Sequence, residues 1–169
     1  MPRCLSFPPV WRADAELLVL GSMPGAESLR QRQYYAFKHN AFWPIMGALF
    51  HFDHTLPYRE RLRRLVENRV ALWDTLQCCE REGSLDADIR HAVPNDLPGL
   101  LAKCPRLKRI LCNGSAAAQH FRRNFPQLVP MMTQLPSTSP AAAQLRFEQK
   151  LDAWRNAIWT ENSHPVDKI

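Results

Sequence analysis

The amino-acid sequence predicts an α/β domain with a short, mostly parallel central sheet and helices on both faces of that sheet. Two observations carry this prediction. Short apolar runs suited to buried strands alternate with segments whose apolar spacing suits helices, which is typical of parallel strands joined by crossover helices. Glycine-rich and polar pieces follow directly after the apolar runs, and ligands bind beyond the carboxyl ends of the strands in such a sheet.

The length and composition suit one small globular protein. The chain has 169 residues, of which 46% are hydrophobic, so we expect a single domain spanning residues 1–169. No apolar run resembles a signal peptide or a membrane span, so we expect a cytosolic protein without a membrane partner. The five cysteines include no C-x-x-C pair and the six histidines are scattered, so we expect no disulfide and no metal.

The net charge of +6 favours a polyanionic partner such as nucleic acid, although many ordinary soluble proteins carry a similar charge.

The first half of the chain predicts two strands and two helices. Residues 16–20, "ELLVL", suit a short buried strand that ends at Gly21. Residues 41–50, "AFWPIMGALF", have helical spacing with a proline in the first turn, where proline is tolerated. Residues 58–68 form an amphipathic helix whose arginines are expected to face solvent. Residues 70–75, "VALWDT", suit a second strand.

The second half of the chain continues the alternation. A short helix follows Asn95, and either Asn95 or Asp96 is expected to cap it. The remaining elements are a strand at 109–114, a helix at 115–125, a weaker strand at 131–136, and a closing helix that follows "STSP" and runs to about Trp159.

The motif "GSMPG" at Gly21–Gly25 stands at the end of the first predicted strand. Glycine lets backbone N–H groups approach a ligand closely, and Pro24 stiffens the turn. Taken alone, the motif is weak, because a plain strand-to-helix turn is the more common explanation for such a sequence. The other predicted strands end near Asp74, Asn113 and Pro136, so we expect one pocket where these ends meet. Asp74 itself suits a general base, a cap or a solvated edge charge.

A second motif, "LPSTSPAAA", places three hydroxyls, Ser137, Thr138 and Ser139, before a proline that suits the start of a helix. The N-terminus of a helix offers free N–H groups to an anion such as a DNA phosphate. Ordinary capping of the helix by Ser139 is the alternative.

The stretch "YYAFKHNAFW", Tyr34–Trp43, sets the amide of Asn40 among aromatic rings. Core packing explains the rings, and so does a pocket that holds a flat base.

Taken together and in this order, these motifs resemble the uracil-DNA glycosylase superfamily, and most of all its hypoxanthine-DNA glycosylase branch, also called DNA-deoxyinosine glycosylases. The resemblance runs from about Phe7 to Trp154. It implies a three-layer α/β/α sandwich and excision of hypoxanthine from DNA after the nucleotide flips into a pocket. It also implies that the partner is DNA containing deaminated bases. We expect no cofactor and a monomeric protein.

The resemblance also implies roles for individual residues. The "N-x-F-W" element is similar to that of the mismatch-specific uracil glycosylases, which places the stacking ring on Tyr35 and the catalytic amide on Asn40. The amide is expected to hold a water and to donate to the base or the substrate. Backbone N–H groups around Ser22 and Met23 are expected to donate hydrogen bonds to O6 of hypoxanthine. The substrate-binding set is Gly21, Ser22, Met23, Pro24, Gly25 and Tyr35, and the DNA-phosphate set is Ser137, Thr138 and Ser139.

Two departures from the family pattern leave other functions open. Many superfamily members have Asn or Asp where Met23 stands, and many relatives have His-Pro where this chain has Phe37-Lys38. The alternatives are a uracil or mismatch-specific glycosylase of the same fold, and a nucleic-acid-binding module without catalytic activity.

Overall fold

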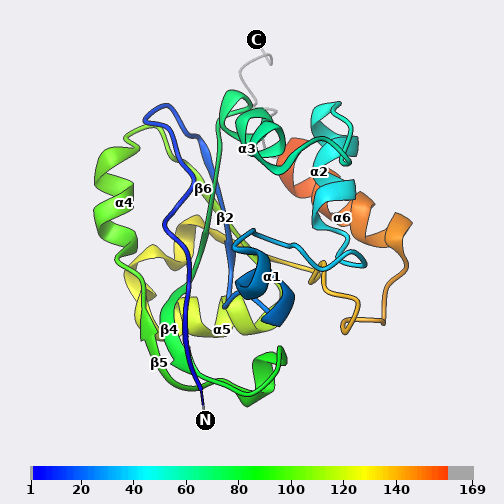
Figure 1. Ribbon diagram of the computed structural model, residues 1–169. Coiled ribbons are helices and arrows are strands. Elements are labelled where there is room, and N and C mark those ends of the chain that lie inside the picture. Colours follow the sequence, from blue (N-terminus) through cyan, green and yellow to red (C-terminus); the bar gives the residue numbers. More distant parts are fainter. Residues whose placement is uncertain (1, 160–169) are drawn as a thin grey trace.

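The computed structural model describes residues 2–159 and has a four-stranded parallel sheet at its centre (Figure 1). The strands lie in the order β3-β2-β6-β7. Their bounds are β2 Leu17–Gly21, β3 Val70–Asp74, β6 Arg109–Asn113 and β7 Met132–Leu135. All three pairings are parallel, and Leu20 of β2 lies between Trp73 of β3 and Cys112 of β6. The predicted α/β class with a mostly parallel sheet is therefore confirmed.

Helices cover both faces of this sheet, which gives three layers (Figure 1). One face is covered by α2 Phe42–Phe50, α3 Tyr58–Glu67 and α6 Phe147–Trp159. The other face is covered by α4 Leu97–Lys103 and α5 Ser115–Asn124. The other helices of residues 2–159 are short. They are α1 Ala26–Gln31 and two 3₁₀ helices, Asp86–Asp88 and Pro126–Met131. None of the helices within residues 2–159 is both long and apolar enough to cross a membrane.

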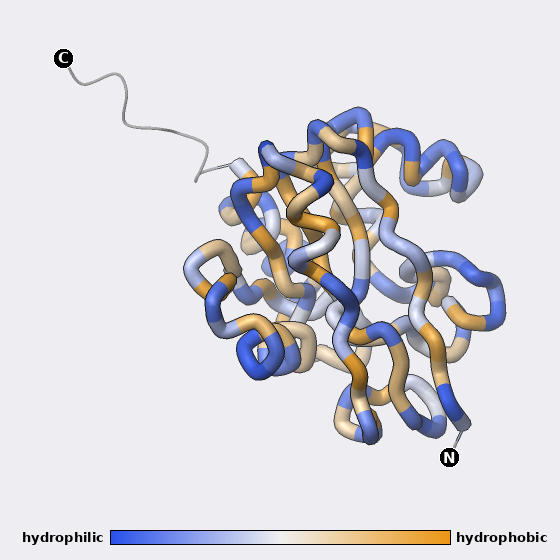
Figure 2. Tube along the Cα trace, turned by 90° about the vertical axis from the view of Figure 1, so that its left-hand side faces the viewer, coloured by the Kyte–Doolittle hydropathy of each residue, from blue (hydrophilic) through white to orange (hydrophobic). Residues whose placement is uncertain are grey.

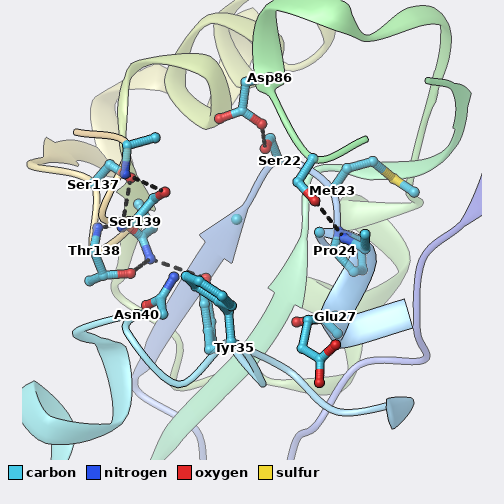
Figure 3. Close-up of a pocket in the computed structure, with 18 of the residues that line it drawn as sticks. Ser22, Met23, Pro24, Glu27, Tyr35, Asn40, Asp86, Ser137, Thr138 and Ser139 are labelled. Carbon is cyan, nitrogen blue, oxygen red and sulfur yellow. Dashed lines mark hydrogen bonds between the residues drawn. The ribbon is translucent and has the colours of Figure 1, made fainter. Parts of the chain in front are cut away.

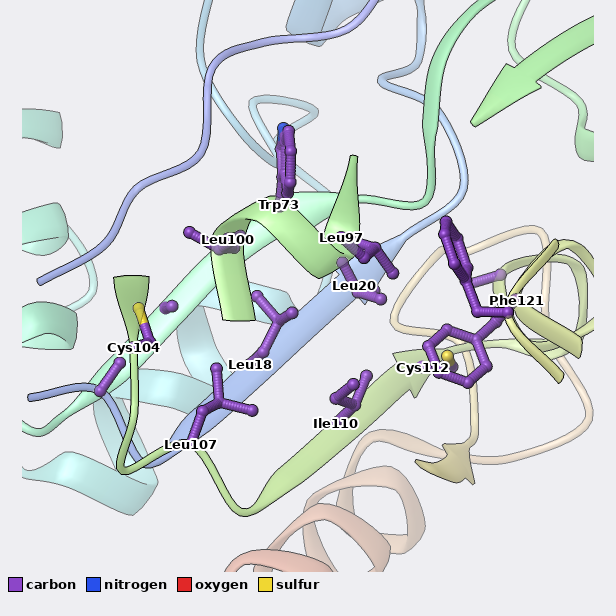
Figure 4. Close-up of a cluster of buried hydrophobic side chains, with 14 of the residues drawn as sticks. Leu18, Leu20, Trp73, Leu97, Leu100, Cys104, Leu107, Ile110, Cys112 and Phe121 are labelled. Atoms are coloured by element: carbon purple, nitrogen blue, oxygen red, sulfur yellow. The ribbon is translucent and has the colours of Figure 1, made fainter. Parts of the chain in front are cut away.

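The alternation of side chains along β2 explains why its sequence is apolar throughout. Leu17 and Val19 belong to the core beneath α2, α3 and α6, whereas Leu18 and Leu20 belong to the core beneath α4 and α5 (Figure 4). A strand covered on both faces has no solvent side and therefore reads as a continuous hydrophobic run. Figure 2 shows the result, with hydrophobic segments gathered in the interior and hydrophilic segments on the outer turns and loops.

A second, antiparallel sheet of three strands was not predicted from the sequence. Its strands lie in the order β1-β4-β5, with bounds β1 Arg3–Leu5, β4 Leu76–Glu80 and β5 Arg90–Pro94. Only Thr75 separates β3 from β4, so the chain passes from one sheet into the other almost without a break. The strands are short and β5 is largely exposed, so they lack the apolar run or strict alternation that signals a strand.

The expectation that a helix begins at Pro140, directly after "STS", is wrong. The closing helix α6 begins at Phe147, and residues 140–146 form turns. The Ser139 hydroxyl accepts from the Ala141 N–H and the Ser139 carbonyl accepts from the Ala142 N–H, which closes a local turn instead. Short polar side chains compete in this way with helix formation, here against three alanines of high helix propensity. The second motif therefore has no helix N-terminus beneath it.

Candidate active site

A pocket of about 320 Å³ opens at the carboxyl ends of the parallel strands (Figure 3). It is lined by the first motif Gly21–Gly25, by Tyr35 and Asn40, and by the second motif Ser137–Ser139. The volume lies at the lower end of the range for small-molecule pockets, about 300–1,000 Å³. The structure thus brings together all the predicted site residues, which lie up to 118 positions apart in the sequence (139 − 21).

The first motif offers backbone donors to the pocket. Gly21 ends β2, and a Cβ placed on it would lie 2.5 Å from Asp74 Oδ1, so a larger residue here collides with the pocket floor. The backbone N–H groups of Ser22 and Met23 have no acceptor within residues 2–159. The Ser22 hydroxyl donates to Asp86, so that side chain is already engaged. The main chain of this motif is therefore the part available to a ligand.

The Met23 side chain has a structural position. It is buried with Leu76, Cys79 and Ile89, in a small core next to the antiparallel sheet. Arg81, which is also buried, donates from Nη2 to the Pro24 carbonyl and so fixes the first motif to the end of β4. The Met23 side chain thus anchors the turn to β4 and contributes no polar group to the pocket.

Tyr35 presents a fixed aromatic ring to the pocket. Its ring stacks on Phe42 with the centroids 4.0 Å apart and the planes 24° apart. The Tyr35 hydroxyl accepts from Asn113 Nδ2 at 3.2 Å, and burial raises the pKa of Tyr35 well above its usual value. The backbone of Tyr35 has φ of 54°, in the left-handed region that non-glycine residues seldom adopt. The surroundings of Tyr35 therefore hold its ring in one orientation.

The amide of Asn40 is oriented by the start of α2. Asn40 Oδ1 accepts from the Phe42 N–H at 2.9 Å, which identifies the oxygen because an amide NH₂ cannot accept. The next residue, Ala41, donates its N–H to the Thr138 carbonyl at 3.0 Å and so ties this loop to the second motif. Asn40 Nδ2 has no hydrogen-bond partner among the described residues. The amide of this pocket-lining residue thus keeps both donors of Nδ2 and one lone pair of Oδ1 unused.

Asn113 and Thr138 form a buried joint that the sequence did not reveal. The Thr138 N–H donates to Asn113 Oδ1, and Asn113 Nδ2 donates to Thr138 Oγ1, both at 2.9 Å. Thr138 is only 1% exposed. Asn113 had suggested only a turn, but it connects the end of β6 to both Tyr35 and the second motif. Of the three predicted phosphate-binding hydroxyls, that of Thr138 lies inside the protein.

Two residues of α6 hold the second motif from behind. Lys150 donates from Nζ to the Ser139 carbonyl at 3.1 Å, and Trp154 donates from Nε1 to the Pro136 carbonyl at 3.0 Å. Both side chains are buried, and burial lowers the pKa of Lys150. Nothing in the local sequence "RFEQKLDAW" marks this lysine, because its partner lies eleven residues earlier in a turn.

Asp74 lies at the floor of the pocket as an unpaired buried acid. It is 3% exposed, and its Oδ2 has no hydrogen-bond partner within the part of the chain that the structure describes. Burial, followed by repulsion from Asp86, raises the pKa of Asp74 to about 7, and the attraction of Arg81 opposes this rise only in part. Within residues 2–159, no three His, Cys, Asp or Glu side chains gather to hold a metal ion.

The raised pKa of Asp74 predicts how stability changes with pH. The folded pKa lies above the ordinary value of 3.8, so the folded state binds the additional proton between about pH 4 and pH 7. The free energy of unfolding therefore falls as pH rises through this window. The full shift corresponds to up to about 4 kcal/mol. We expect Asp74→Asn to unfold at a higher urea concentration than the unchanged protein at pH 8, and at a similar concentration near pH 4. An equal difference at both pH values would contradict this account.

Comparisons with known proteins agree with the fold and the motifs. A family model described as the uracil DNA glycosylase superfamily matches residues 8–161. Two similar proteins are each named hypoxanthine DNA glycosylase. The protein from Methanosarcina barkeri is 36% identical over 153 residues, and that from Methanosarcina acetivorans is 38% identical over 157 residues. Each match covers 90% of this chain and 96% of the relative.

A solved structure supports the same relationship. It is a solution NMR structure described as a candidate uracil DNA glycosylase from Methanosarcina acetivorans. The TM-score is 0.77 and the sequence identity 33%, and the match covers 92% of this chain and 98% of that one.

Proposed function

Because the chain belongs to the uracil DNA glycosylase superfamily, we propose that it excises hypoxanthine from DNA by hydrolysing the N-glycosidic bond of a flipped deoxyinosine. The two Methanosarcina relatives that carry the name hypoxanthine DNA glycosylase support this substrate. The observation that carries the proposal is the pocket itself. It joins an aromatic ring, an oriented amide and unpaired backbone N–H groups within one cavity beyond the strand ends.

In the proposed complex the base lies against Tyr35 and is recognised at its six-membered ring. The stack contributes roughly 1–3 kcal/mol, which helps offset the few kcal/mol needed to flip a nucleotide. The free N–H groups of Ser22 and Met23 are suited to donate hydrogen bonds to O6 of hypoxanthine. Adenine carries an amino group at that position and would leave a donor unpaired, so these N–H groups select against adenine.

Asn40 is proposed as the catalytic residue. Cleavage of the N-glycosidic bond places positive charge on the sugar and negative charge on the departing base. The lone pair left on Asn40 Oδ1 accepts from a water and aims it at the sugar carbon, while Nδ2 donates to the base or the substrate. The Phe42 N–H holds the amide in place before the substrate arrives. One preorganised polar group of this kind contributes on the order of 3 kcal/mol to lowering the barrier.

Ser137 and Ser139 are proposed to contact a DNA phosphate at the rim of the pocket. Both are partly exposed, and the buried Lys150 places a positive charge directly behind their turn. Thr138 is proposed to hold the turn in place and not to contact phosphate, because its hydroxyl already accepts from Asn113.

Binding to DNA is expected to weaken with salt. Two or three phosphate contacts, including one from Lys38, predict a roughly tenfold rise in Kd between 50 mM and 150 mM salt. Fluorescence anisotropy with a labelled duplex measures this directly. Tight binding that does not change over this range would contradict phosphate contacts.

The function is tested with a labelled duplex that contains a single deoxyinosine. Excision without strand cleavage gives a product that breaks only after treatment with alkali, and this is the expected result. A parallel duplex with one deoxyuridine distinguishes a uracil or mismatch-specific enzyme. Binding without product from either duplex would indicate a nucleic-acid-binding module that lacks activity.

A further inference from the structure

We propose that Phe37 is the side chain that enters the DNA base stack as the target nucleotide flips out. The proposal rests on the proposed function, because it concerns how the same pocket receives its substrate. A base that leaves the duplex leaves a gap, and an apolar wedge inserted there unstacks the neighbouring step and keeps the base outside.

Phe37 is the most exposed of the phenylalanine, tyrosine and tryptophan rings in the stretch Tyr34–Trp43. The rings of Tyr34, Phe42 and Trp43 are each at most 4% exposed, whereas Phe37 is 45% exposed. Phe37 also lines the pocket that contains Tyr35 and Asn40. A phenylalanine that stays nearly half exposed at the edge of a pocket keeps apolar surface available to a partner.

The backbone on both sides of Phe37 is held in place. The Ala36 N–H donates to Ser28 Oγ at 3.1 Å, and the Asn40 N–H donates to the Phe37 carbonyl at 2.9 Å. The second bond closes a tight turn of four residues, so the position of Phe37 is coupled to that of Asn40. The His39 ring packs edge-on against Phe37, with the centroids 5.4 Å apart. A wedge requires an exposed ring on such a supported backbone.

The charged residues next to Phe37 favour contact with DNA, whereas those next to Leu85, the other large exposed apolar residue of the pocket, oppose it. Phe37 precedes Lys38 and His39, both exposed, which favours an approaching phosphate backbone. Leu85 also lines the pocket and is 57% exposed, but Asp86 and Asp88 follow it. Negative charge on that loop opposes contact with DNA.

The second motif offers no wedge of its own. The residues after Pro140 are three alanines, which are too small to fill the space of a base pair. Among the large apolar side chains that line the pocket, Phe37 is therefore the one that is exposed, has its backbone held by hydrogen bonds on both sides, and is followed by basic residues.

The test compares excision from a duplex with excision from a single strand, because only the duplex has a stack to open. Phe37→Ala is expected to lower single-turnover excision from the deoxyinosine duplex about tenfold and to change excision from a single-stranded deoxyinosine oligonucleotide by less than twofold. Phe37→Trp, which keeps a large ring, is expected to retain most of the duplex activity. Phe147→Ala is the matched control, since Phe147 is 41% exposed on α6 and does not line the pocket.

Two outcomes overturn the proposal. Equal losses on duplex and single strand would make Phe37 a wall of the base pocket. A duplex-specific loss in Leu85→Ala, with none in Phe37→Ala, would move the wedge to the other loop.

Binding to a duplex with a stable abasic-site analogue tests the wedge without catalysis. Phe37→Ala is expected to raise its Kd about tenfold, and an unchanged Kd also overturns the proposal. If the unchanged protein excises hypoxanthine from neither substrate, the proposed function fails, whereas this measurement still decides the role of Phe37.

Discussion

Asn40→Ala is expected to lower single-turnover excision of hypoxanthine by about 10²–10³-fold, the range for removing one preorganised polar group. The substitution removes both the Oδ1 lone pair that is proposed to direct water and the two donors of Nδ2. Binding to DNA is expected to change little, because Asn40 is not placed against phosphate. The rate of excision is measured with enzyme in excess over DNA, and the product is cleaved with alkali before it is counted. Binding to DNA is measured by fluorescence anisotropy.

The variant Asn40→Asp separates the two halves of the amide. Aspartate keeps an oxygen that accepts from the Phe42 N–H and another that can hold water, but it loses the nitrogen donor. We expect it to retain more activity than alanine. Alanine also loses the hydrogen bond from the Phe42 N–H at the start of α2, which costs about 1 kcal/mol of stability. If aspartate loses as much activity as alanine, donation to the substrate is the main role of Asn40.

Asp74 is the competing candidate for a general base, and the structure makes this comparison informative. It lies in the same pocket with a pKa near neutrality, so a proton-accepting role is chemically accessible. Loss of excision in Asp74→Asn, together with near-normal excision in Asn40→Ala, would transfer the activation of water from the amide to the carboxyl group.

Tyr35→Ala is expected to lower excision by about 10–100-fold, because stacking on a base contributes roughly 1–3 kcal/mol. The truncation also leaves Phe42 without its stacked partner and so loosens the wall of the pocket. The matched variant Tyr35→Phe keeps the ring and removes only the hydroxyl that accepts from Asn113. We expect Tyr35→Phe to lie within a few fold of the unchanged protein. A loss in the phenylalanine variant as large as in alanine would assign the effect to the hydrogen bond and not to the stack.

The parallel sheet could be predicted from the sequence because a strand that is buried on both faces is hydrophobic at consecutive positions. The strand sequences "LLVLG" and "RILCN" are apolar at their central positions, and each ends at a residue that lines the pocket. Strand ends in a parallel sheet meet at one edge, so motifs far apart in the chain could be placed together. The cap of α4 was also readable, since Asp96 accepts from the Gly99 N–H as an N-cap residue does.

The sequence was uninformative where structure depends on distant partners. The strand β5 has no core face of its own and exists because β4 supplies hydrogen bonds. The joint between Asn113 and Thr138 spans 25 positions, and either residue alone looks like an ordinary turn former. The predicted start of the closing helix was wrong for a local reason. The turn closed by the Ser139 hydroxyl is formed in place of a helix, despite the high helix propensity of the alanines that follow.

The hydrogen bonds from α6 to the second motif have a consequence for biosynthesis. Lys150 and Trp154 are among the last described residues to leave the ribosome, yet they hold the turn that closes the pocket. A nascent or prematurely terminated chain that lacks this helix still contains Asn40, Tyr35 and the first motif. Without the two bonds from α6, however, the turn at Pro136–Ser139 loses its support from behind. The pocket is therefore completed only after α6 has left the ribosome and packed against the turn at Pro136–Ser139.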